Sequence, residues 1–228
     1  MTTATRPKTD KHTTKPVKAP LDRSDGFHVD VSEESLGYNK PQVAGRALWL
    51  PMLVMAVMGW GIGFALAIVE AGTDRTDLAT LQDLGNLVPA FMFVGFLGVF
   101  SAITFAIARI LGEFRKGGGE VQALAGDKVQ TIKMPSTAKL MLVFMAMGMM
   151  VMIAGIATNF ASAANFDATA ADLLERASWG AAACGLGRLG VALYLVGITF
   201  GLGTIIEVLR FQSIRIGEVA KHQGHEHN

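Results

Sequence analysis

The stretch from Leu140 to Ala164 reads LMLVFMAMGMMVMIAGIATNFASAA and contains no charged residue. A helix needs about 20 mainly apolar residues to cross the hydrocarbon layer of a bilayer, so residues 140–164 are long enough to span it. Three other blocks share this length and character: 47–69, 84–108 and 179–206, the last interrupted only by Arg188. Only 17% of the 228 residues are charged, too few to coat such helices as the core of a water-soluble protein. The sequence therefore predicts an all-α integral membrane protein with four transmembrane helices packed as a four-helix bundle.

Positive charge is distributed unevenly among the polar segments. Lys and Arg number eight in residues 1–46, six in residues 109–139 and three after residue 209, but one in each of the two remaining loops. Because loops rich in Lys and Arg stay in the cytoplasm, both termini are expected there. No signal peptide is visible near the start, and a multi-pass protein of a prokaryotic cytoplasmic membrane is expected. The predicted order is a cytoplasmic, largely disordered tail (1–46), a transmembrane domain (47–212) and a cytoplasmic C-terminal tail (213–228).

Two polar segments carry further signals. Residues 26–38 include apolar side chains such as Phe27 and Val29, so this part of the tail has the alternative of ordering against a partner. Gly117, Gly118 and Gly119 open the middle polar segment without the Gly-Lys-Ser/Thr ending of a phosphate-binding loop. The three glycines are interpreted as a flexible joint.

The two halves of the chain resemble each other. Pro51–Gly59, PMLVMAVMG, aligns with Leu140–Gly148, LMLVFMAMG, and Ile103–Phe105 aligns with Ile198–Phe200. The offset between the halves changes from 89 to 95 residues within the repeat. Each repeat would be one helical hairpin that enters and leaves the membrane on the same side. Two such repeats are parallel and related by an axis along the membrane normal, unlike the inverted repeats of many transporters.

Arg188 is the charged residue that the repeat places inside the membrane. It aligns with Phe93, well within the second span. A buried membrane arginine costs at least about 2.5–3.5 kcal/mol, so it usually faces the bundle interior or a partner. Glu70, at the outer end of the first span, is the expected partner within the chain. The alternative is that the fourth span begins at Leu189 and Arg188 snorkels to the interface.

Small residues predict where helices approach closely. The candidate packing positions are Gly59, Gly63, Gly185, Gly187, Gly190, Gly197 and Gly201.

Methionines and histidines are the candidate metal ligands. Four methionines fall on one face of the third span, and thioethers bind Cu(I). The candidate ligands are Met141, Met145, Met149, Met152, His222, His225 and His227. Methionine is also an adaptable packing residue, which is the competing interpretation of the same pattern.

Several chemistries are excluded or unsupported. All five histidines lie outside the spans, so the helices offer no axial ligand for haem b. The single cysteine, Cys184, excludes a disulfide within the chain and a cysteine-ligated iron–sulfur cluster. No catalytic constellation is visible, and a net charge of +1 does not favour nucleic acid as a partner. No catalytic residue and no bound cofactor are predicted, apart from the Cu(I) alternative.

These observations favour a non-catalytic subunit that anchors or stabilises a larger membrane complex, such as a respiratory or oxidising enzyme. Its expected partners are the lipid bilayer and other membrane subunits or copies of itself. One alternative is a small oligomeric channel or carrier, for instance for metal ions such as copper. Another is a membrane enzyme or sensor with a quinone pocket between its helices.

Overall fold

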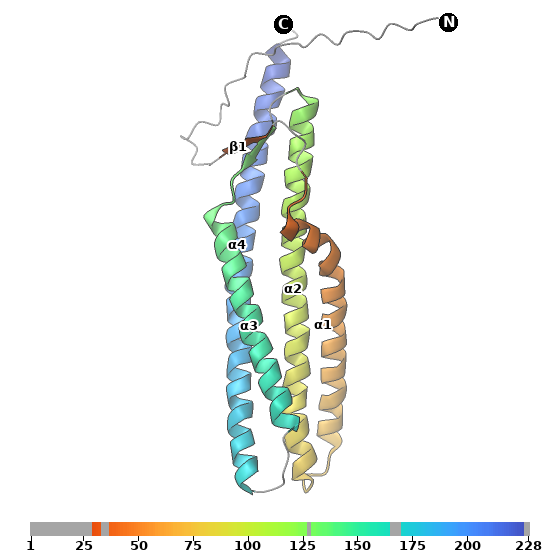
Figure 1. The fold of residues 1–228 in the computed structure, drawn as a ribbon. Helices are drawn as coiled ribbons and strands as arrows, with labels where there is room; N and C mark the ends of the chain where they lie inside the picture. The colour runs from red at the N-terminus through yellow and green to blue at the C-terminus, as the bar shows by residue number, and fades with distance from the viewer. Residues whose placement is uncertain (1–28, 33–36, 127–128, 165–169, 226–228) are drawn as a thin grey trace, which may run out of the picture.

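The computed structural model describes residues 29–32, 37–126, 129–164 and 170–225. Within them lie four long helices and two short strands (Figure 1): β1 (Val29–Ser32), α1 (Lys40–Gly72), α2 (Leu78–Leu124), β2 (Val129–Ile132), α3 (Ser136–Ala164) and α4 (Ala170–His225). All four described helices are long and apolar enough to cross a membrane. The prediction of an all-α membrane protein with four spans in a helical bundle is confirmed.

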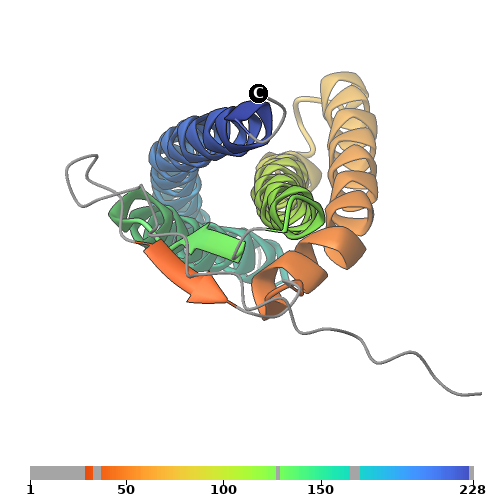
Figure 2. The same ribbon diagram turned by 90° about the horizontal axis from the view of Figure 1, so that it is seen from above.

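α2 forms the centre of the bundle. The closest packing joins α1 to α2 and α3 to α4, and α2 also packs against both α3 and α4. Among the described helices, α2 alone contacts all of the others extensively. Figure 2, which looks along the helices, shows α2 between α1 and α4. The two hairpins are therefore joined through α2, and α1 has a broad apolar face that no other described residue covers.

The two hairpins make their close helix contacts at matching positions. A Cβ atom on Gly59 of α1 would lie 2.7 Å from the backbone nitrogen of Gly95 in α2. A Cβ atom on Gly148 of α3 would lie 3.2 Å from the carbonyl oxygen of Gly190 in α4. Gly148 and Gly190 follow Gly59 and Gly95 by 89 and 95 residues, the two offsets at which the halves of the sequence align. The same hairpin packing thus occurs twice.

α1 begins at Lys40, before the apolar span that was predicted from residue 47. The backbone N–H of Asn39 donates to Oε1 of Gln42 at 2.9 Å and so caps the helix start. Pro51 consequently lies inside α1. Proline has no N–H to bond the carbonyl of Ala47, which bends a helix. Figure 1 shows the start of α1 turned away from the rest of the helix.

α2 and α4 extend far beyond the bilayer at the end that holds the strands. With 47 and 56 residues, they are about 70 and 84 Å long at 1.5 Å per residue, whereas the hydrocarbon core is only about 30 Å thick. We call the parts of α2 after Ala108 and of α4 after Ile206, together with β1 and β2, the stalk. The opposite end of the molecule is called the loop end.

Two parts of the predicted tails are ordered in the stalk. β1 falls within the segment predicted to be largely disordered and pairs antiparallel with β2, with Val29 opposite Ile132. The predicted C-terminal tail continues α4 as far as His225. β1 lies in residues 26–38, the part of the N-terminal tail for which ordering was the alternative, and its partner strand is about a hundred residues away in the sequence.

The glycine run of α2 is not a flexible joint. Gly117, Gly118 and Gly119 lie inside the helix. A Cβ atom on Gly118 would collide with the side chain of Gln212 from α4. Gln212 Nε2 donates to the carbonyl oxygen of Phe114 at 3.2 Å. The prediction of a joint was wrong because the three glycines continue α2, where Gly118 allows close packing against α4 in the stalk.

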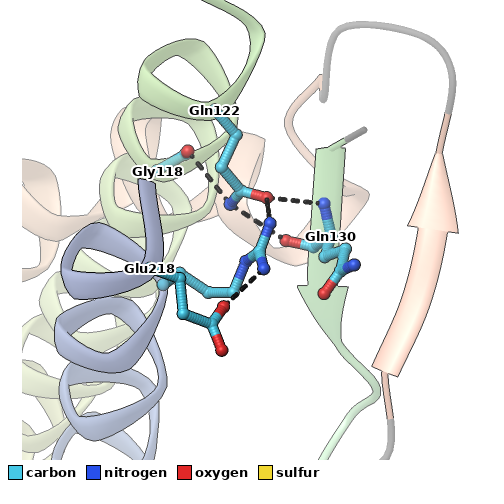
Figure 3. Close-up of polar contacts among 5 residues, drawn as sticks. Gly118, Gln122, Gln130 and Glu218 are labelled. Atoms are coloured by element: carbon cyan, nitrogen blue, oxygen red, sulfur yellow. Dashed lines mark hydrogen bonds and ion pairs between the residues drawn. The ribbon is translucent and has the colours of Figure 1, made fainter. Parts of the chain in front are cut away.

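A buried polar network fastens β2 to the two stalk helices (Figure 3). Gln122 is 2% exposed, and its Nε2 donates to the carbonyl oxygens of Gly118 and Gln130, both at 3.2 Å. Its Oε1 accepts from the backbone N–H of Gln130 at 2.8 Å and from Arg215 Nη2 at 3.4 Å. Arg215 Nη1 also donates to Glu218 Oε2 at 2.6 Å. One glutamine therefore links α2, β2 and α4.

The loop end is held by a helix cap and an ion pair. Asp77 Oδ1 accepts from the backbone N–H of Thr80 at 3.1 Å, which caps α2. Hydrogen bonding from Thr80 lowers the pKa of Asp77, because it favours the carboxylate form. Arg176 of α4, 4% exposed, pairs with Asp83 of α2 at 3.1 Å. This pair connects the second hairpin to the first at the membrane edge.

Candidate functional site

Arg188 lies in α4, close to the middle of the membrane-spanning part. Gly190 packs against α3, since a Cβ atom there would lie 3.0 Å from Cβ of Met152. Met152 is the middle residue of the uncharged block 140–164. Two residues of helix correspond to about 3 Å, so Arg188 lies roughly 3 Å from the mid-plane of that block, on its loop-end side. The nearer hydrocarbon boundary is then about 12 Å away, which argues against the snorkelling alternative.

The Arg188 side chain has no partner in the described part of the chain. It is exposed on the outside of α4, and it forms no hydrogen bond or ion pair with the described residues. Glu70, its expected partner, is half-buried two residues before the end of α1. α1 lies across α2 from α4. The structure therefore does not bring Arg188 and Glu70 together, because they stand on helices that are not neighbours.

A stripe of exposed residues runs along α4 on both sides of Arg188, and we call it the α4 outer face. Its members follow one another at alternating spacings of four and three residues: Ala181, Gly185, Arg188, Ala192, Leu195, Thr199, Leu202 and Ile206. Around Arg188 they are small, and a Cβ atom on Gly185 would meet no atom within 4 Å. Small residues on an exposed membrane helix allow another helix to approach closely.

The other predicted packing glycines face helices of the same chain. Gly63 lies against Met92, and Gly187 against Phe93, both of α2. Of the seven predicted positions, six contact a neighbouring helix: Gly59, Gly63, Gly187, Gly190, Gly197 and Gly201. Gly185 differs from them because it lies on the α4 outer face.

The four methionines of α3 do not form a continuous row of thioethers. Met141, Met145 and Met152 are 4%, 4% and 0% exposed, whereas Met149 is 36% exposed. Thr104 Oγ1 donates to the sulfur of Met145 at 3.0 Å. The three buried methionines fill the space that the missing side chains of three glycines leave beside α4: Gly201, Gly197 and Gly190. Their arrangement is that of helix packing, and Met149 lies apart from them.

The predicted histidine ligands are not placed by the structure. The backbones of His222 and His225 belong to the last turns of α4. Their side chains, and the whole of His227, lie outside the described residues. Within the described residues, no three His, Cys, Asp or Glu side chains lie close enough together to hold a metal ion.

One buried polar pair in the membrane core escaped the sequence analysis. Tyr194 of α4 and Ser101 of α2 are 0% and 2% exposed, and their hydroxyl oxygens lie 3.2 Å apart. Phe100 stacks on the Tyr194 ring with centroids 5.3 Å apart. Each hydroxyl gives the other a hydrogen-bond partner where lipid and apolar side chains offer none. A serine and a tyrosine 93 residues apart carry no recognisable pattern, so only the fold reveals the pair.

Comparison with known proteins does not assign this chain to a family. No family model matches it, and no solved structure matches it. A stretch of 66 residues, 29% of this chain, is 36% identical to the probable multidrug resistance protein NorM of Neisseria meningitidis. That stretch covers 14% of the NorM chain. The resemblance is thus local, and this chain spans a small part of that relative's length.

Proposed function

We propose that this protein is a non-catalytic subunit that anchors or stabilises a larger membrane complex, with a respiratory or oxidising enzyme as the expected class. The observation that carries the proposal is Arg188, close to mid-membrane on the exposed face of α4 and without a partner among the described residues. A lipid-facing arginine at this depth costs at least about 2.5–3.5 kcal/mol. A partner helix that presents a carboxylate or several carbonyl oxygens at the same level removes this penalty.

The surroundings of Arg188 support the same proposal. Gly185 and Ala192 lie one turn to either side on the α4 outer face, so a partner backbone can approach closely enough for short hydrogen bonds to the guanidinium. Arginine offers five N–H donors in a fixed fork, which suits pairing with a single carboxylate. The partner chemistry that fits is therefore a transmembrane helix with an acidic residue near its midpoint.

The proposal is tested by extracting the native protein in mild detergent and identifying what co-purifies in fixed proportion. The wild-type chain is expected to bring larger membrane subunits with it. Arg188→Leu is expected to lose them, while the isolated chain becomes no less stable, because a lipid-facing charge has been removed. Recovery of a lone, stable oligomer of this chain would contradict the proposal, as would full retention of the partners by Arg188→Leu.

A second pair of variants separates docking from folding. Gly185→Leu adds a bulky side chain on the α4 outer face where no atom of the chain lies within 4 Å. It is expected to weaken co-purification and to leave the isolated chain folded. Gly61→Leu is the matched control, because Gly61 of α1 likewise has no neighbour within 4 Å. If both substitutions weaken the complex equally, the α4 outer face is not the docking surface.

We also propose that the stalk lies in the cytoplasm of a prokaryotic cell. The excess of Lys and Arg in the segments that form the stalk supports this sidedness. The local similarity to a multidrug resistance protein of a bacterium fits the prokaryotic source.

A small oligomeric channel or carrier is the second candidate, and the stretch shared with a multidrug resistance protein is the observation in its favour. Flux of metal ions, ammonium or anions into liposomes that contain the purified chain would support it. That flux should disappear in Arg188→Ala, or in Met149→Leu if copper passes along α3. Absence of flux for all three classes would remove this candidate.

A further inference from the structure

A pocket of about 430 Å³ lies where the stalk meets the membrane. Its walls come from the start of α1, from α2 and α4, and from the junction between β2 and α3. The inner part is apolar, with Met141, 4% exposed, among its lining residues, and Phe211, 1% exposed, lines the pocket on the stalk side. Ala108 and Leu111 of α2 belong to the same wall. An apolar pocket of this size suits part of a hydrocarbon chain.

The outer part of the pocket carries two cations, Arg115 and Lys133. Arg115 of α2 lines the pocket and forms no hydrogen bond or ion pair with the described residues. Its Nε atom is buried without a partner. Lys133 of the β2–α3 junction lines the same pocket. A buried guanidinium N–H without an acceptor is costly, so the arrangement calls for an anionic group that is not part of the described chain.

The start of α3 adds to the positive electrostatic potential of the pocket. Met134, Pro135 and Ala138 line the pocket, and α3 begins between them at Ser136. The first N–H groups of a helix have no partner within the helix and carry the positive end of its dipole. Together with Arg115, this helix end favours an anion with several oxygen acceptors, such as a phosphate.

The depth of the pocket matches the boundary of a bilayer. The uncharged block of α2 ends at Ala108, and Arg115 lies about 10 Å further along the helix. The polar headgroup layer adds roughly 5–8 Å to each side of the hydrocarbon core, and an arginine side chain reaches back over such a distance. The apolar part is therefore level with the ends of the spans, and the cations are level with the headgroups.

We propose that this pocket binds one anionic phospholipid of the leaflet on the stalk side, with its phosphate on Arg115 and Lys133 and its upper acyl chain against Met141 and Leu142. A phosphate accepts two parallel hydrogen bonds from an arginine, which makes the contact strong and directional. Basic pockets between membrane helices on the cytoplasmic side are typical sites for such headgroups. The alternative source of the same chemistry is a water-soluble phosphate compound.

The test uses the full-length chain, delipidated in detergent, with native mass spectrometry to count bound lipids. Phosphatidylglycerol is compared with phosphatidylcholine of the same acyl composition. The wild type is expected to bind one phosphatidylglycerol at least about tenfold more tightly than phosphatidylcholine, and Arg115→Gln is expected to lose this preference. Equal binding of the two lipids by the wild type, or an unchanged preference in Arg115→Gln, would overturn the proposal.

Two further variants keep the test specific. Lys116→Gln removes the neighbouring cation, which is about half exposed, pairs with Glu120 and does not line the pocket; its lipid preference should equal that of the wild type. Leu142→Trp enlarges a half-exposed side chain at the apolar part of the pocket. It should lower the affinity for phospholipid without changing the preference for phosphatidylglycerol that Arg115 provides. If inorganic phosphate displaces phosphatidylglycerol at equal concentration, or if Leu142→Trp has no effect, the occupant is a soluble phosphate and the lipid proposal fails.

Discussion

Gln122 shows how much one side chain contributes outside the membrane. Its side-chain nitrogen donates hydrogen bonds and its side-chain oxygen accepts them. These bonds hold β2 and Arg215 against α2. Arg215 is 3% exposed, so its charge depends on Gln122 and Glu218 for compensation. In a buried network of this kind, the loss of one member leaves the others without partners.

Gln122→Leu is therefore expected to release β2 from the helices. The substitution leaves the N–H of Gln130 and one donor of Arg215 unpaired, at about 1–3 kcal/mol for each buried group. Amide hydrogen exchange of Val129–Ile132 should become much faster. Gln130→Leu is the control, because the Gln130 side-chain oxygen has no partner among the described residues and only its backbone joins the network. Equal acceleration in both variants would show that Gln122 is not the fastening residue.

At this scale the sequence drew attention to one residue and missed others. Arg188 was found because a charge within an apolar block stands out in any hydropathy reading. Gln122 and Arg115 were missed because polar residues in a polar segment carry no such contrast. Their significance depends on neighbours that folding brings together, such as Arg215, which is 93 residues from Gln122.

At the scale of the helix, the close approach of backbones defines the hairpins. The Cβ position of Gly59 lies 2.7 Å from a backbone nitrogen of α2, a contact that no side-chain movement can relieve. Gly61, two residues later, has no atom within 4 Å of its Cβ position. The two glycines therefore differ only in what lies beside them.

Gly59→Ala is expected to destabilise the α1–α2 hairpin by roughly 1–3 kcal/mol, because it forces two helices apart. Gly61→Ala should be neutral or slightly stabilising, since alanine is the better helix former. Thermal unfolding of both variants in the same detergent provides the comparison. A loss of stability in Gly61→Ala as large as that in Gly59→Ala would rule out close packing as the cause.

The sequence predicted the existence and order of the helices but not their ends. The four apolar blocks all lie inside described helices, because hydropathy reports which residues contact lipid. It does not report where a helix stops in water, so the stalk portions of α2 and α4 were assigned to a loop and a tail. In this part of α2, Gly118 packs against Gln212 and so brings the helix into contact with α4.

At the scale of the whole molecule, the sidedness remains a prediction from charge distribution. It is tested in a Cys184→Ala background with a membrane-impermeant maleimide. Thr76→Cys, in the loop between α1 and α2, should be labelled in intact cells. Gly217→Cys, in the stalk and without a neighbour within 4 Å, should be labelled only after permeabilisation. The reverse pattern would invert the proposed topology.

The repeat predicted a paired arrangement, and the structure has two hairpins with matching glycine contacts. The sequence did not predict that α1 and α4 would stand apart on either side of α2. A helix that is apolar on all sides has no single apolar face, so its sequence does not indicate which helices pack against it. For the same reason, the exposure of Arg188 and the pocket beside Arg115 emerged only from the assembled fold.

The length of α4 links two regions that are otherwise separate. The helix contains no proline and runs unbroken from the loop end to His225. Arg188 and Arg215 are about 40 Å apart along it at 1.5 Å per residue. A partner that tilts α4 by about 5° at the level of Arg188 would shift the Arg215 end by roughly 3–4 Å for a rod of that length. α4 then acts as a rigid rod. A partner that binds at Arg188, in the middle of the bilayer, would displace the strands outside the bilayer.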